Sequence, residues 1–174
     1  MRKSWVFGMA IALLAPMAVL TAGPASAVGG TLCPAPSGTI TILPGLGKTP
    51  KAQTITFNLP LKSCKGGGVT GGSVKGSEKT KPVDIATFSK GKALPLSATV
   101  AWAPKSKGTS KFTATATTTT KGSVISYSIK SKISSGLFVG GTLTTSGTVS
   151  FGKPGKGGTI SNLILKGKKP FAIT

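Results

Sequence analysis

Apolar and polar residues alternate along much of this chain. Ile55, Phe57 and Leu59 alternate with polar residues, so three apolar side chains fall on one face of an extended strand. The same period of two recurs over residues 96–102, 112–116, 125–129 and 142–151, and residues 160–165 form a nearly continuous apolar run. A period of two that is repeated this often predicts an antiparallel sheet with one buried face and one solvated face.

Short segments rich in glycine or proline separate these stretches. They lie at residues 44–47, 65–68, 90–92, 105–108, 121–122 and 152–155. Because glycine supplies positive φ angles and proline fixes φ, we place turns there. The pattern predicts an all-β domain over residues 28–174, with about eight to ten short strands in an immunoglobulin-like antiparallel β-sandwich or a closed β-barrel. Segment 65–82 has the weakest pattern, and its glycines favour an edge strand or a mobile loop.

The first 27 residues have the organisation of a signal peptide. Arg2 and Lys3 precede an apolar stretch that is expected to be helical, and Ala25-Ser26-Ala27 matches the small-residue cleavage pattern. The apolar stretch is shorter than the roughly 20 residues of a membrane-spanning helix. We therefore expect cleavage between Ala27 and Val28, with no transmembrane segment left and a product that is secreted or associated with the cell envelope.

Cys33 and Cys64 are the only cysteines in the chain. Export places them in an oxidising compartment, where a pair of cysteines in a small domain is typical of a disulfide. A metal site would need more ligands, and a catalytic thiol would need a nearby base. The sequence therefore predicts a structural Cys33–Cys64 disulfide.

The composition narrows the possible chemistry. Of 174 residues, 22 are Lys or Arg, 2 are Asp or Glu and none is His, which gives a formal net charge of +20. Without histidine, the commonest general base and metal ligand is missing, and Glu78 and Asp84 are the one possible carboxylate pair. Residues 47–49 resemble the end of a P-loop but lack its upstream glycine, and the Ser-x-x-Lys matches at Ser89 and Ser150 lie in predicted turns. We expect a non-catalytic protein without a metal or cofactor.

The lysines concentrate at predicted strand ends and turns. The candidate contacts for a polyanion are Lys90, Lys92, Lys105, Lys107, Lys166, Lys168 and Lys169. Lysines at strand edges also discourage aggregation between sheets, and for any single pair that explanation is sufficient. For the whole chain, the excess of positive charge predicts attraction to anionic envelope polymers or anionic surfaces.

The expected binding is loose, salt-sensitive and not sequence-specific. Arg2 is removed with the signal peptide, so the mature chain has no guanidinium group to read guanine or clamp a phosphate. Several aromatic residues fall at core positions, which disfavours a stacking platform for single-stranded nucleic acid. We therefore expect no specific recognition of DNA or RNA.

The mature chain also resembles a group of proteins. Residues 97–102 (SATVAW) are similar to the tryptophan strand, and residues 135–142 (SGLFVGGT) to the glycine-rich penultimate strand, of small secreted β-rich proteins of high-GC Gram-positive (actinobacterial) bacteria. The cleavage site and the spacing of Cys33 and Cys64 fit the same group. The resemblance implies secretion and a β-rich fold, and it supplies no catalytic residue.

Three functions follow from the sequence. The leading one is a secreted binding or structural protein whose lysine-rich loops adhere to anionic polymers or surfaces. The alternative is a carrier that holds a small hydrophobic ligand in its β interior, which an interior filled by Phe57, Trp102, Phe112 and Phe151 would eliminate. The third, an enzyme with an unusual Lys, Ser or Thr centre, would need a lysine shielded in a cleft.

Overall fold

The structure is a computed structural model that describes residues 29–90, 94–121 and 124–174. The predicted signal peptide and its cleavage site at Ala27 and Val28 lie outside the described residues. No helix within the described ranges is long and apolar enough to cross a membrane.

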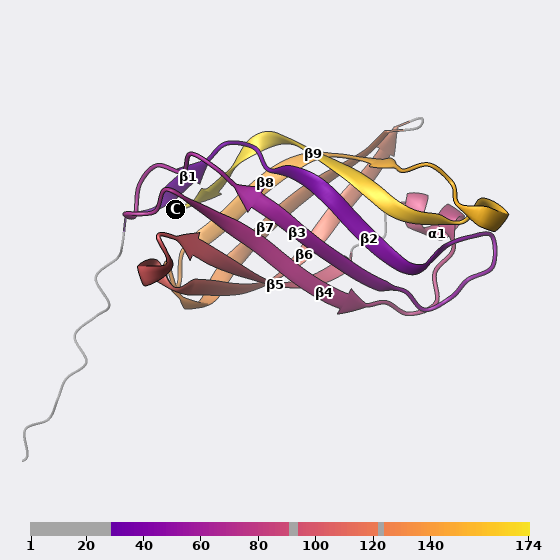
Figure 1. Cartoon of the computed structure of the whole chain (residues 1–174), viewed down its shortest axis with the longest axis horizontal. Helices are drawn as coiled ribbons and strands as arrows, with labels where there is room; N and C mark the ends of the chain where they lie inside the picture. The colour runs from indigo at the N-terminus through magenta and orange to yellow at the C-terminus, as the bar shows by residue number, and fades with distance from the viewer. Residues whose placement is uncertain (1–28, 91–93, 122–123) are drawn as a thin grey trace, which may run out of the picture.

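The domain is a closed antiparallel barrel of eight strands with one extra strand (Figure 1). The barrel strands are β2 (Ser37–Leu46), β3 (Thr54–Leu61), β4 (Gly71–Lys79), β5 (Leu94–Ala103), β6 (Thr109–Lys121), β7 (Val124–Gly136), β8 (Thr142–Phe151) and β9 (Ile160–Ile173). Each strand pairs with the next along the chain, and β9 closes the barrel by pairing with both β8 and β2. The prediction of an all-β fold is confirmed, and of the two architectures left open the structure is the barrel.

The extra strand β1 (Thr31–Cys33) pairs with the last residues of β9. It lies on the same edge of β9 as β2, which pairs with the first half of that strand. Residues 34–36 connect β1 to β2, so β9 pairs along one edge with two successive strands. This arrangement brings the beginning of the described chain beside its C-terminus.

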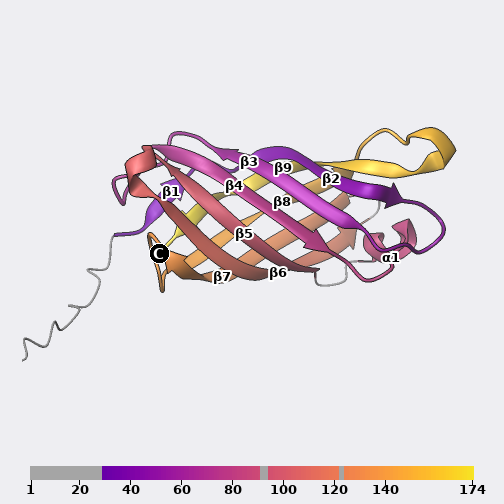
Figure 2. The same ribbon diagram turned by 60° about the horizontal axis from the view of Figure 1, so that its bottom comes forward.

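The barrel has two ends, which we name by what closes them. The α1 end carries the β2–β3 loop, the β8–β9 loop with the short helix η2 (Lys156–Gly158), and the β4–β5 connection with helix α1 (Ile85–Ser89). The disulfide end carries β1, the C-terminus, the β3–β4 and β7–β8 loops, and η1 (Lys105–Lys107) between β5 and β6. Figure 2 shows the strands running obliquely between these ends, as barrel closure requires.

The predicted apolar faces point into the barrel. Buried positions alternate along β6, β7 and β8, and the core includes Val100, Trp102, Phe112, Tyr127 and Leu143. The polar residues between them face solvent, because successive side chains of a strand point to opposite faces. The predicted alternation is therefore confirmed.

The expectation for segment 65–82 is wrong for its central part. Residues 71–79 form β4, which pairs along its length with β3 and over residues 71–76 with β5, so it is not an edge strand. Its glycines have a packing role: a Cβ added at Gly76 would lie 2.3 Å from the ring of Phe57, its partner on β3. Gly147 on β8 faces Tyr127 on β7 in the same way, with 2.8 Å to the ring. These inward glycines leave room for aromatic rings on the neighbouring strands.

Candidate functional site

The barrel encloses an apolar cavity of about 110 Å³. Its wall includes side chains from all eight barrel strands, among them Ile40, Phe57, Phe112, Leu143 and Leu163. No polar atom of the described residues contributes to its surface. An apolar cavity of this kind stays dry, and engineered examples of about 150 Å³ bind benzene. The cavity therefore suits a small apolar molecule.

The aromatic residues named in the carrier hypothesis divide into two groups. Phe57 and Phe112 line the cavity, whereas Trp102 and Phe151 are outside its lining. These four side chains do not fill the cavity. The filled interior that would have eliminated a carrier is therefore not observed.

An aromatic cluster closes the disulfide end. Trp102 on β5 packs edge-on against Phe138 of the β7–β8 loop, with ring centroids 5.2 Å apart, and against Phe171 on β9 at 6.4 Å. Gly67 of the β3–β4 loop lies under the Phe138 ring, where a Cβ would come within 2.3 Å of it. Two segments distant in sequence therefore contact one tryptophan, and a third, the β3–β4 loop, contacts the Phe138 ring.

The polar groups of this cluster are paired. The Trp102 indole N–H donates to Ser110 Oγ at 2.8 Å, and the Ser110 hydroxyl donates to the carbonyl of Leu137. Ser110 is fully buried. Buried polar groups destabilise a fold when they lack hydrogen-bond partners. Because the indole N–H and the Ser110 hydroxyl are paired, both can be buried at the disulfide end without that penalty.

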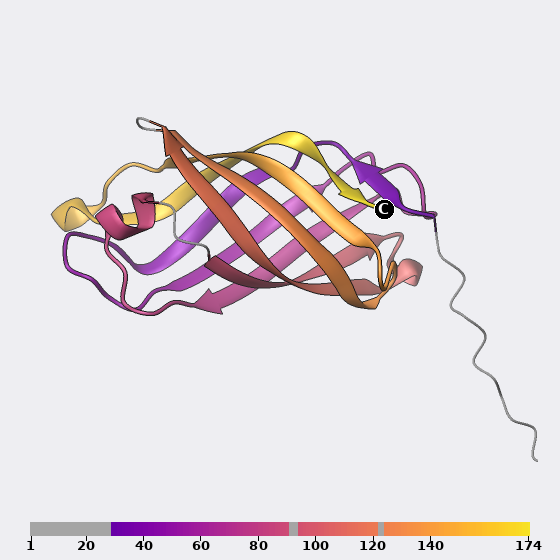
Figure 3. The ribbon, with the colours of Figure 1, turned by 180° about the vertical axis from the view of Figure 1, so that it is seen from behind.

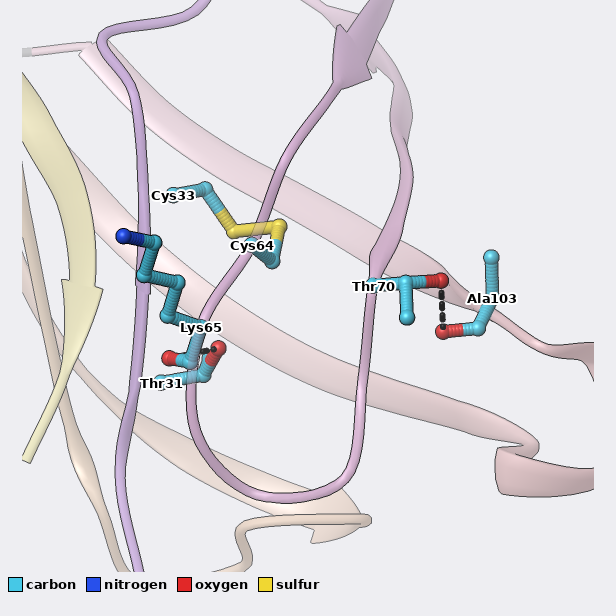
Figure 4. Close-up of a disulfide and its surroundings, with 6 residues drawn as sticks. All are labelled: Thr31, Cys33, Cys64, Lys65, Thr70 and Ala103. Carbon is cyan, nitrogen blue, oxygen red and sulfur yellow. Dashed lines mark hydrogen bonds between the residues drawn. A yellow bond between two sulfur atoms is a disulfide. The ribbon is translucent and has the colours of Figure 1, made fainter.

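The predicted disulfide is present and lies beside this cluster (Figure 4). It joins Cys33 of β1 to Cys64 of the β3–β4 loop, and both residues are buried. Leu32 and Lys65 exchange two backbone hydrogen bonds of 2.9 Å next to it. The Thr31 hydroxyl also donates to the Lys65 carbonyl at 3.2 Å. The bond thus ties the extra strand to a loop of the barrel.

The α1 end is closed more lightly. Helix α1 has five residues, none of them buried, and it reaches the cavity through the half-buried ring of Phe88. That ring lies 6.4 Å from the ring of Phe151 on β8. Figure 3, from behind, shows the short helix lying at this end of the barrel. Phe88 is thus the α1 side chain that lines the cavity, and Ile85 of the same helix also packs against the core.

Helix α1 is held by hydrogen bonds at both of its ends. Asp84 is its N-cap and accepts from the Thr87 N–H at 2.6 Å, a hydrogen bond that lowers the pKa of Asp84. The Ile85 N–H donates to the Gly47 carbonyl at 3.0 Å, and the Thr120 hydroxyl of β6 donates to the carbonyl of Ser89. The structure therefore explains one of the two acids as a helix cap.

Buried Gln53 organises the loop next to α1. Its side-chain amide accepts from the Gly45 N–H at 3.0 Å and donates to the carbonyls of Gly45 and Lys51 at 3.2 Å each. Lys51 in turn pairs with Val83, just before the helix. The sequence reading missed Gln53, although a lone amide between a proline turn and an apolar strand was a usable signal.

Tyr127 of β7 lines the cavity and has an unusual environment. Its hydroxyl is buried without a hydrogen-bond partner among the described residues. Burial raises the pKa of Tyr127 to about 12, and the neighbouring Thr145 hydroxyl offsets part of that rise. Tyr127 is the only tyrosine in the chain, so it is a specific probe of the barrel interior.

The predicted polyanion contacts do not form one site. Lys90 follows α1 at one end, Lys105 and Lys107 lie in η1 at the other, and Lys92 is outside the described residues. Only Lys166, Lys168 and Lys169 are together, on β9. Every lysine that the structure describes is exposed, so none of them is shielded in a cleft as a lysine-based catalytic centre would require.

The sequence reading missed two neighbours of the β9 lysines. Lys130 and Lys132 lie on the outer face of β7, two strands from β9, with β8 between them. They are two residues apart in the sequence, but their place beside the β9 lysines depends on strand order. Their alternation with inward Ile129 and Ile133 was the available signal that they face outward.

Comparison with known proteins found no family model, no curated protein and no solved structure that matches this chain. The resemblance to secreted actinobacterial proteins stays a prediction.

Proposed function

We propose that this domain binds a small apolar molecule inside its barrel, outside the cytoplasm. The observation that carries the proposal is the cavity of about 110 Å³, which is lined by apolar surface alone. Ligand pockets of β-barrels lie in the interior or the mouth of the barrel and are mostly apolar. The signal-peptide pattern and the Cys33–Cys64 disulfide support an extracellular or envelope location.

The two ends of the barrel add support. The disulfide end is closed by a packed, hydrogen-bonded cluster, whereas α1 covers the other end with no buried residue of its own. A cavity with one firm end and one lightly covered end has a route for exchange with solvent. The ligand class is a small hydrocarbon or aromatic compound, because a polar group would lose its hydrogen bonds in this cavity.

Toluene binding to the mature protein tests this proposal. At a free toluene concentration ten times its Kd, ligand-linked stabilisation is about 1.4 kcal/mol, which a thermal melt detects as a higher Tm. Ala116→Leu places extra carbons in the cavity wall and is expected to abolish the shift. The matched control is Ala101→Leu on the outer face of β5, which should retain it. An equal shift in both variants would place toluene elsewhere and refute the proposal.

The exposed lysines favour a second function, adhesion to anionic envelope polymers or surfaces. The chain has only two acids to offset its positive charge, and the described lysines all face solvent. Attraction of this kind is expected to be salt-dependent. The mature protein should be retained on a carboxylate resin at low salt and released as salt rises. Retention that does not change with salt, or no retention at low salt, would exclude this function.

A further inference from the structure

The lysines within strands are unevenly distributed around the barrel. Strands β2 to β5 contain only Lys75 and Lys79, both on β4. Strands β6 to β9 contain Lys111, Lys121, Lys130, Lys132, Lys166, Lys168 and Lys169. Both acids of the chain lie on the β4–α1 side, with Glu78 on β4 and Asp84 capping α1. One side of the barrel is therefore positively charged and carries no acidic side chain among the described residues.

We name as the basic wall the outer face of β7, β8 and β9. Its lysines are Lys130, Lys132, Lys166, Lys168 and Lys169, and Figure 3 brings this side of the barrel, in orange and yellow, toward the viewer. Register places Lys130 opposite Thr144 and Lys169 opposite Ser146. With ordinary strand geometry, Lys130 and Lys169 are about 12 Å apart at their backbones. The lysines are thus close enough to act on one extended polymer.

Hydroxyl groups occupy the wall between the lysines. Strand β8 presents Thr142, Thr144, Ser146, Thr148 and Ser150 outward, in alternation with its buried residues. Opposite them on β7 are Ser126 and Ser128. A hydroxyl both donates and accepts hydrogen bonds, which suits sugar hydroxyls, while an ammonium group pairs with carboxylate. The wall therefore offers both groups that a carboxylated polysaccharide requires.

Nucleic acid fits this surface less well. The large exposed apolar side chains of the described residues are Leu32, Leu43, Val124, Val139 and Ile164, with no aromatic ring on which a base could stack. The chain's one arginine, Arg2, lies in the predicted signal peptide. We propose that the basic wall is a docking surface for a linear, carboxylated polysaccharide. This inference rests on the proposed adhesion to anionic polymers and assigns it to one face.

The test compares two variants with the same loss of charge. The wall variant carries Lys130→Gln, Lys132→Gln, Lys166→Gln and Lys169→Gln. The control variant carries Lys48→Gln, Lys51→Gln, Lys153→Gln and Lys156→Gln, all exposed and all at the α1 end. Binding to polygalacturonate at low salt is measured by calorimetry, and circular dichroism checks that each variant is folded.

We expect the wall variant to lose at least about ten-fold in affinity, and the slope of log K against log salt to fall by about two to four. The control should lose less than about three-fold. Equal losses would show that the total charge binds the polymer, which refutes the wall but keeps the proposed adhesion. No binding by the unmodified protein would refute both.

A second comparison tests the hydroxyl groups. The variant with Thr144→Val, Ser146→Ala and Thr148→Val keeps every charge of the wall. It should bind polygalacturonate several-fold more weakly and bind polyglutamate, an anionic chain without hydroxyls, with unchanged affinity. If the unmodified protein bound polyglutamate or single-stranded DNA as tightly as polygalacturonate, recognition of a polysaccharide would be refuted.

Discussion

The two ends of the barrel are closed by different kinds of structure. At the disulfide end, Trp102 is 3% exposed and contacts aromatic rings from a loop and a distant strand, with its indole N–H paired to Ser110. At the α1 end, the covering helix has no buried residue and contributes one half-buried ring, Phe88. Both ends cover the interior, but only the disulfide end does so with an aromatic cluster.

This difference indicates which end of the barrel contributes more to stability and which end opens more readily for a ligand. The aromatic cluster, the disulfide and the Trp102–Ser110 hydrogen bond all lie at the disulfide end, so local opening there would cost much of the folding free energy. Opening at the α1 end would break a few hydrogen bonds and expose the partly buried side chains of Val83, Ile85 and Phe88. We therefore expect ligand exchange at the α1 end, and four measurements test this comparison.

The largest effect is expected for Trp102→Ala. The substitution removes a buried indole and leaves Ser110 Oγ without its donor, so we expect a loss of about 3–5 kcal/mol in the free energy of unfolding. Urea unfolding followed by far-ultraviolet circular dichroism measures it. A loss below about 1 kcal/mol would show that the cluster does not support this end.

Removal of the disulfide is expected to have the next largest effect. The bond closes a loop with a sequence separation of 31, and the chain-entropy model gives about 3–4 kcal/mol for such a loop. The double variant Cys33→Ser, Cys64→Ser should melt at a lower temperature than the oxidised protein and at the same temperature as the reduced protein. Equal melting of oxidised and reduced protein would contradict a stabilising role.

Tyr127 tests whether the α1 end excludes water. Its pKa is raised from 10.0 to about 12 by burial, so the neutral form is favoured in the folded state. The resulting stability is present in full below pH 10 and is lost as pH rises from about 10 through 12, by about 3 kcal/mol in all.

The tyrosinate absorbance of this single tyrosine follows the titration, and the same pH series on Tyr127→Phe is the control for every other pH-dependent effect on stability. A midpoint near 10 in the folded protein would mean that solvent reaches the interior through the α1 end.

Phe88→Ala should have the smallest effect on stability. Its ring is only half-buried, and we expect a loss of about 1 kcal/mol, against about 3–5 kcal/mol for Phe138→Ala, the same substitution at the disulfide end. Stopped-flow fluorescence, recorded after each variant is mixed with toluene, should show faster association of toluene with Phe88→Ala than with Phe138→Ala or the unmodified protein. Equal destabilisation of the two variants would remove the contrast between the ends.

Much of the fold could be predicted from the sequence because it depends on local order. The alternation around Ile125, Tyr127 and Ile129 specifies a strand and its inward face whatever that strand pairs with. Cys33 and Cys64 could only pair with each other, since the chain has no other cysteine. The positive charge of the surface likewise follows from composition.

Segment 65–82 shows where local reading fails. Its glycines favoured an edge strand or loop, yet Gly76 lies in a paired strand because Phe57 on the neighbouring strand needs the space. The reason is a contact across the sheet, and nothing in the sequence around Gly76 records it.

The sequence by itself determined the strands, their inward faces, the disulfide and the sign of the surface charge, because each depends on neighbours along the chain or on composition alone. Only the tertiary structure decided that β9 would close a barrel against β8 and β2, that the cavity would remain inside it, and that Lys130 would lie near Lys169. These features depend on which strand edges meet, and residues far apart in sequence make that choice together through packing.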